Sequence, residues 1–167
     1  MSRVNPIITF DDFDMQWINL YSSRIDATKV FTGAHSKKHD VTKSEFELTY
    51  IGTMGEYAAS KYFCSDMDMG LHRGGDNGTD LIINGQAVHL KTTNRYGVPL
   101  LILDSIKCFT TKLGMVAKIL SPIKVELCGL VSRTYFYQNH SIRDFGYGNR
   151  LVMSVDEMVH VDRILEL

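Results

Sequence analysis

The chain has 167 residues, of which 44% are hydrophobic and 22% charged, and its formal net charge is −1. This length and composition are typical of one globular domain with its own hydrophobic core. No apolar run is long enough to cross a membrane and no signal-peptide pattern opens the chain, so we expect a soluble, cytoplasmic protein without membrane contact. The near-neutral charge argues mildly against a nucleic-acid partner, because such proteins usually carry a basic surplus.

The cysteines are three in number and show no CxxC spacing. We therefore expect Cys64, Cys108 and Cys128 to be reduced and structural, as in a cytosolic protein, and we expect no zinc site.

The first predicted element is an extended segment at residues 1–9, followed by a helix. Asp11 and Asp12 can cap this helix, which we expect to run to about Phe31 and to stop at Gly33. Its predicted apolar side consists of Trp17, Leu20, Tyr21 and Ile25.

The segment that links this helix to the next is locally basic. Residues 24–43 contain five lysine or arginine residues and two aspartates. Such a surface can follow a phosphate backbone, and it can equally be a solvated helix end and loop. His35 and His39 have the i, i+4 spacing of a helical metal site, but we expect a loop here and therefore no bound metal.

A second helix is predicted over residues 42–63. Thr42 and Glu45 form the S/T-x-x-E signal of a capping box. Each glycine inside a helix costs about 1 kcal/mol relative to alanine. Gly52 and Gly55 therefore indicate that another element packs closely there. We expect that element to be a sheet, which would bring Glu56 next to Asp80.

The most informative stretch is GGDNGTDLIINGQAVHLKTT, residues 74–93. Asn84-Gly85 between two apolar runs is a strong β-hairpin signal. Asp80 opens the first strand, and on the second strand His89 and Lys91 share one face because side chains two residues apart point the same way. A carboxylate that binds a hard cation, a histidine and a lysine together are suited to phosphate chemistry. The alternative is a turn cap beside a solvated strand face.

The second half of the chain is predicted to be rich in strands. Continuous apolar runs indicate strands covered on both faces, which helices on either side of a mixed sheet would provide. We expect strands at residues 99–103, 113–119, 123–131 and 151–153, a helical turn after Arg133 and a flexible loop at residues 146–150.

In chain order these features are a G-x-x-G-E-x-A helix, a G-x-D segment and a hairpin that ends in x-x-K. This order resembles the PD-(D/E)XK nuclease superfamily. It is similar to small nuclease-like proteins, many of them encoded by bacteriophages, in which GGDxGxD leads into an x-D-x-K-T-T strand. Residues 124–133, 142–150 and 155–167 resemble the later strand, loop and closing segment, so the resemblance covers about residues 42–167.

The resemblance implies one α/β domain, residues 1–167, whose central mixed β-sheet is flanked by helices as in restriction endonucleases. Residues 1–41 would be an N-terminal helix and connector, and residues 42–167 the nuclease-like core. It further implies a phage-encoded endonuclease in the host cytoplasm that hydrolyses phosphodiester bonds in DNA with Mg²⁺ or Mn²⁺. Many members of the superfamily act as dimers, so a homodimer is an open alternative.

The same resemblance assigns the site residues. Glu56 and Asp80 would be catalytic metal ligands, the backbone carbonyl of Leu90 would complete the metal shell, and catalytic Lys91 would position the water. Further residues near the motif are candidates for substrate binding: Arg73, Thr92, Thr93, Tyr147 and Arg150.

One position departs from the superfamily pattern. His89 stands where an acidic residue or glutamine is usual, two positions before the lysine. His89 can be a metal ligand that shifts the preference toward Mn²⁺. Alternatively the site is weakened, and the protein is a catalytically degenerate nuclease fold that binds nucleic acid or a host or defence protein without cutting. Asp76 could supply a compensating carboxylate, although Gly-Asp-Asn-Gly fits a turn better.

Overall fold

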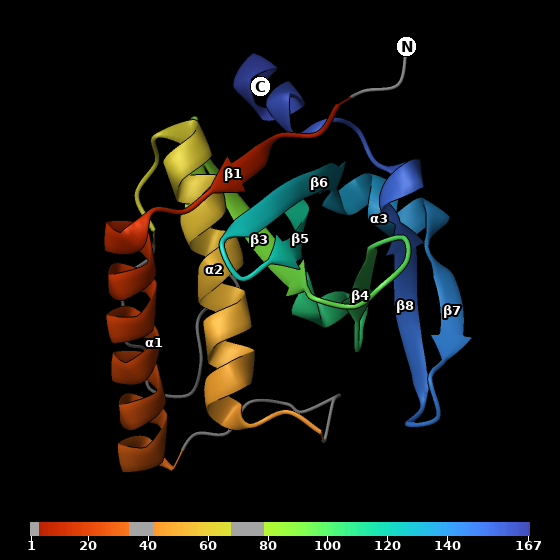
Figure 1. Cartoon of the computed structure of the whole chain (residues 1–167). Coiled ribbons are helices and arrows are strands. Elements are labelled where there is room, and N and C mark those ends of the chain that lie inside the picture. The colour runs from red at the N-terminus through yellow and green to blue at the C-terminus, as the bar shows by residue number, and fades with distance from the viewer. Residues whose placement is uncertain (1–3, 34–41, 68–78) are drawn as a thin grey trace.

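The computed structural model describes residues 4–33, 42–67 and 79–167. A short strand and two long helices come first, and the other strands follow (Figure 1). In chain order the elements are β1 (Ile7–Thr9), α1 (Asp12–Thr32), α2 (Glu45–Phe63), β2 (Leu81–Ile83), β3 (Gln86–Thr93), β4 (Leu100–Leu103), η1 (Ile106–Cys108), β5 (Leu113–Ser121), β6 (Lys124–Ser132), α3 (Arg133–Asn139), β7 (Ser141–Asp144), β8 (Asn149–Ser154), η2 (Val155–Glu157) and η3 (Val161–Glu166).

The main sheet has five strands in the order β1-β6-β5-β3-β2. The pair β3–β5 is parallel, with His89 opposite Gly114, and the other neighbouring pairs are antiparallel. The parallel pair needs a long connection, which β4 and η1 provide between β3 and β5. The α/β class with a mixed sheet is thereby confirmed.

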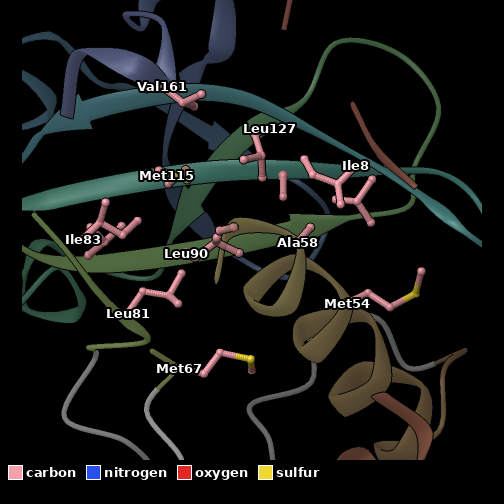
Figure 2. Close-up of a cluster of buried hydrophobic side chains, with 14 of the residues drawn as sticks. Ile8, Met54, Ala58, Met67, Leu81, Ile83, Leu90, Met115, Leu127 and Val161 are labelled. Atoms are coloured by element: carbon pink, nitrogen blue, oxygen red, sulfur yellow. The ribbon is translucent and has the colours of Figure 1, made fainter. Parts of the chain in front are cut away.

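Helix α2 covers one face of this sheet, and α1 packs mainly against α2 (Figure 1). Figure 2 shows Ala58 of α2 and Leu90 of β3 facing the same cluster, together with Met115 of β5 and Leu127 of β6. These side chains are almost fully buried. Burying an aliphatic side chain of this size contributes about 1.5–3 kcal/mol, so this cluster is a principal source of stability.

The opposite face is covered largely by a second sheet, in the order β4-β8-β7. A second cluster lies beneath it and includes Leu101, Phe109, Phe136 and Met153. The prediction of helices on both faces was therefore wrong in this respect. Continuous apolar strands report that both faces are buried, but they do not reveal what buries them.

Helix α1 begins and ends close to the predicted positions. Asp11 and Asp14 form a capping box at its start, and Gly33 ends it with a φ of 70°. Its predicted apolar side was partly wrong, because Leu20 is 73% exposed. The described part of the extended segment predicted before α1 includes the strand β1, which pairs with β6.

Helix α2 begins later than the predicted capping box. Ser44 is the N-cap, and its partner at the third helical position is Glu47 rather than Glu45. Two overlapping S/T-x-x-E patterns occur here, and the pattern alone does not choose between them.

Helices α1 and α2 are joined by a buried polar cluster. Tyr57 donates a hydrogen bond of 2.7 Å to Asp14, which also contacts Lys61. Burial alone would raise the pKa of the Asp14 carboxyl. The hydrogen bonds from Lys61, the Asp11 backbone and Tyr57, with the lysine charge, outweigh burial and hold that pKa below its usual value. Burial, then the hydrogen bond to Asp14, raises the pKa of Tyr57 to about 12.

The remaining differences concern the end of the chain. The predicted flexible loop at residues 146–150 is largely the turn and second strand of the β7–β8 hairpin. The three cysteines are thiols, and burial raises the pKa of Cys128 to about 12, which makes it unreactive. No helix in the described ranges is both long and apolar enough to span a bilayer.

Candidate functional site

The β2–β3 hairpin forms as predicted and positions the polar residues. Asn84 and Gly85 have positive φ values of 49° and 73°, the left-handed pair that a tight two-residue hairpin turn requires. Asp80 immediately precedes β2, and its N–H donates to the Val88 carbonyl at 2.9 Å. The hairpin therefore returns Asp80 to the middle of β3, as the sequence predicts.

The Asp80 carboxylate is 7% exposed and contacts two groups of β3. Its Oδ2 accepts a 2.6 Å hydrogen bond from the Leu90 N–H. The same oxygen lies 3.2 Å from Nδ1 of His89, which is also buried. A carboxylate against Nδ1 fixes the orientation of the imidazole ring.

Lys91 lies two residues beyond His89 on the same face of β3 and is exposed. No hydrogen bond or ion pair joins its ammonium to another residue of the described ranges. An exposed lysine beside a buried carboxylate–histidine pair is placed to meet an anionic group that arrives from solvent.

The other face of β3 is occupied by α2. Gly55 lies so close to this strand that an added Cβ would be 1.9 Å from Oγ1 of Thr92 and 3.0 Å from Leu90. The glycine prediction is confirmed, because only a residue without a side chain permits this approach. The Thr92 hydroxyl is buried in this contact with α2, and its predicted substrate contact stays a prediction.

Glu56 follows Gly55 on α2 and is half-buried. Because α2 packs on the Leu90 and Thr92 face of β3, His89 and Lys91 lie on the opposite face from this helix. Within residues 4–33, 42–67 and 79–167, no three His, Cys, Asp or Glu side chains are grouped closely enough to hold a metal. The structure thus brings Asp80 and His89 together, and the ligand role of Glu56 stays a prediction.

The described donors still fit one kind of metal site. The N–H and C=O of a strand residue point to the same strand edge, so the Leu90 carbonyl points toward the edge where Asp80 binds its N–H. Magnesium is often held by one or two carboxylates, with water and substrate phosphates completing its shell. Asp80, His89 and the Leu90 carbonyl therefore suit a cation that binds together with a phosphate, and the imidazole favours Mn²⁺ over Mg²⁺.

The remaining substrate-binding candidates either contact other residues of the protein or lie outside the residues that the structure describes. Thr93 accepts a hydrogen bond from the Arg95 N–H at 3.2 Å. Arg150 makes a 2.9 Å ion pair with Asp104 and lies over the Tyr147 ring, 5.2 Å from its centre. These contacts hold the β7–β8 turn in place. Arg73, like His35, His39 and Asp76, lies outside the described residues.

Sequence reasoning missed Phe109, which lies beside the candidate site. Its ring is 6.4 Å from that of His89, and it covers Gly114, the β5 partner of His89. Phe109 follows η1, far from the motif in sequence, and no local pattern marks it. It provides an apolar wall that limits the access of water to the histidine.

A separate open groove of about 470 Å³ lies between α1 and α2, lined by Met15, Gln16, Asn19, Phe46 and Tyr50. None of these residues belongs to the Asp80–His89 pair. The candidate site is therefore defined by its polar side chains rather than by this groove.

Comparison with protein-family models, with curated proteins and with solved structures finds no match to this chain.

Proposed function

We propose that this protein hydrolyses phosphodiester bonds in DNA at a site centred on Asp80, His89 and Lys91. The observation that carries the proposal is the pairing of a buried carboxylate–histidine contact with an exposed lysine two residues further along the same strand face. The order of these residues along the chain, which resembles the PD-(D/E)XK superfamily, supports the same reaction.

Each residue has a separate task in this proposal. Lys91 binds the phosphate and stabilises the negative charge that grows as a water oxygen bonds to phosphorus and the bond to the leaving sugar oxygen breaks. Asp80 orients the His89 ring. Asp80, His89 and the Leu90 carbonyl would hold Mg²⁺ or Mn²⁺, which when bound supplies charge neutralisation and a more acidic water.

The first test is a plasmid-nicking assay with Lys91→Ala. We expect the rate to fall by about 10²–10³-fold, the usual cost of removing one charge-stabilising group. Because Lys91 is exposed, we expect the free energy of unfolding to change by less than about 0.5 kcal/mol.

The matched control is Lys124→Ala, which removes an exposed lysine from β6 and should leave the rate unchanged. Nicking by Lys91→Ala at the wild-type rate would contradict the proposed site.

A second function has one specific observation in its favour. Oδ2 of Asp80 already contacts the Leu90 N–H and His89, and the described residues form no three-ligand group. A nuclease fold that binds DNA without cutting would have this arrangement. It predicts that DNA binding, followed by fluorescence anisotropy, is equal in EDTA and in Mn²⁺ and that no nicking occurs in either.

A further inference from the structure

The loop that follows the strand of Lys91 presents a fully exposed aromatic ring. Residues 94–98 connect β3 of the main sheet to β4 of the second sheet (Figure 1). Tyr96 in this loop is 104% exposed, more than any other aromatic residue that the structure describes. Its ring therefore contributes nothing to the hydrophobic core, and both of its faces are open to solvent.

The backbone of this loop is nevertheless held in place. Hydrogen bonds anchor it to β3, to β5 and to the residues before α2. They run from the Arg95 N–H to Oγ1 of Thr93 (3.2 Å), from Nζ of Lys118 to the Gly97 carbonyl (2.8 Å) and from Nζ of Lys43 to Oδ1 of Asn94 (2.6 Å). An anchored loop presents its side chain in a defined place, so less conformational entropy is lost when a ligand binds the ring.

The loop lies beside the sheet face that carries Lys91. Thr93 is two residues beyond Lys91 on β3 and pairs with Lys118 of β5, so these three side chains share one face. Two of the three anchor the loop. Tyr96 is five residues beyond Lys91, at most about 17 Å of extended chain. A single DNA strand bound at Lys91 can therefore reach the Tyr96 ring within a few nucleotides.

The surroundings of the loop are basic. Lys43, Lys91, Arg95 and Lys118 all lie in the loop, in its anchors or on the adjoining strand face. Glu126 is opposite Lys118 on β6, and it accepts a hydrogen bond of 2.8 Å from Asn5. The balance of charge is positive, as the phosphate backbone of a bound strand requires.

We propose that Tyr96 stacks on an unpaired base of the DNA strand whose phosphate binds Lys91, which makes DNA with unpaired nucleotides the preferred substrate. This inference rests on the proposed function, because it places a base relative to the phosphate that Lys91 holds. An aromatic ring beside a basic surface is the combination that binds single strands without reading their sequence.

The chemistry of the ring favours unpaired over paired DNA. Inside a duplex both faces of a base are covered by its neighbours, and exposing one costs a few kcal/mol of unstacking and unpairing. An unpaired base has a free face and does not incur that cost. The phosphate contacts of the lysines are common to both forms of DNA, so the preference depends on Tyr96.

The test is fluorescence anisotropy in EDTA with two probes at one salt concentration, a fluorescein-labelled oligothymidine and its duplex with oligoadenine. We expect wild type to bind the single strand more tightly than the duplex. Tyr96→Ala should weaken single-strand binding about 5- to 100-fold, the contribution of stacking one base, and duplex binding by less than about twofold.

Two further variants identify the ring as the cause. Tyr96→Phe keeps the aromatic face and should bind both probes like wild type. Phe13→Ala is the matched control, because it removes a ring that is 72% exposed at the start of α1. That end of α1 contacts Tyr57 and Lys61 near the end of α2, whereas the loop is anchored by Lys43 before its start. Phe13→Ala should therefore change neither affinity.

Wild-type protein that binds the single strand no more tightly than the duplex would overturn the inference. So would a Tyr96→Ala protein with wild-type affinity for oligothymidine, even if plasmid nicking shows that the enzyme is active. Conversely, binding of oligothymidine that depends on Tyr96, without cleavage of any DNA in Mn²⁺, would contradict the proposed hydrolysis and leave the base contact in place.

Discussion

The carboxylate of Asp80 has both a structural and a proposed catalytic task. It is the acceptor for the Leu90 N–H inside the protein, and it holds the His89 ring. A buried N–H without an acceptor costs about 1–3 kcal/mol, so the residue is needed for stability even if the protein has no activity. Loss of activity on mutation of Asp80 is therefore ambiguous until stability is measured.

Two substitutions at Asp80 separate these tasks. Asp80→Ala should lower the free energy of unfolding by about 1–3 kcal/mol, because the Leu90 N–H loses its acceptor. Asp80→Asn keeps an acceptor oxygen and should cost less than about 1 kcal/mol, yet it should nick DNA as poorly as Asp80→Ala. Urea unfolding and plasmid nicking measure both quantities. An Asp80→Asn protein with wild-type activity would restrict Asp80 to the structural task.

At the scale of elements, the contact between α2 and β3 depends on one glycine. Gly55→Ala would place a methyl group 1.9 Å from Oγ1 and 2.9 Å from Cβ of Thr92, so the helix must move away from the strand. We expect a loss of about 1–3 kcal/mol in the free energy of unfolding, the usual cost of overpacking a core.

Gly52→Ala is the control on the same helix. Its added methyl group would find only Glu56 Oε1, at 4.0 Å, and alanine favours the helix over glycine by up to about 1 kcal/mol. We expect it to be neutral or stabilising in the same urea measurement. If both substitutions lower the free energy of unfolding equally, the close contact of Gly55 with β3 is not the cause of the loss in Gly55→Ala.

Local patterns predicted most of the elements. The Asn84-Gly85 turn and the glycine at position 55 each have a specific backbone requirement, and a short stretch of sequence shows it. The β7–β8 hairpin was missed because Gly146 and Gly148 resemble a flexible loop. In the structure the Asp144 carboxylate accepts hydrogen bonds from both glycine N–H groups and orders the turn.

Features that depend on distant parts of the chain were not predictable. Helix α1 has apolar residues on its exposed side as well as on its buried side, and periodicity could not tell which side faces the core, so Leu20 was assigned to the wrong side. The contact of Phe109 with the candidate site depends on how the β4–β5 connection folds over β5. Tertiary packing likewise decides which face of β3 is covered by α2. Because α2 covers the face of Leu90 and Thr92, Glu56 of this helix and the pair His89 and Lys91 lie on opposite faces of β3.

At the scale of the whole molecule, the main sheet has one core cluster on each face. Val116 of β5 belongs to the cluster beneath the second sheet, while its neighbours Met115 and Ala117 belong to the cluster under α1 and α2. Strands β5 and β6 thus contribute to both clusters. We therefore expect the two to unfold together, as the predicted single domain requires.

Trp17, the one tryptophan of the chain, reports on this coupling. It is stacked on Tyr21 and Tyr57 in the α1–α2 region, whereas Met153 lies in the cluster under the second sheet. Met153→Ala should cost about 2–5 kcal/mol and lower the urea midpoint of Trp17 fluorescence and of far-UV circular dichroism equally. A fluorescence midpoint that stays at the wild-type value would show two independently folding units.

The most direct test of the proposed function is the metal preference of DNA nicking at position 89. With His89 as a ligand, wild type should cut plasmid faster in Mn²⁺ than in Mg²⁺. His89→Asp, which places a second carboxylate beside Asp80, should raise the Mg²⁺-supported rate at least about tenfold and gain thermal stability on addition of Mg²⁺. Folded wild-type and His89→Asp proteins that cut in neither metal, with no stabilisation by Mg²⁺, would contradict the proposal.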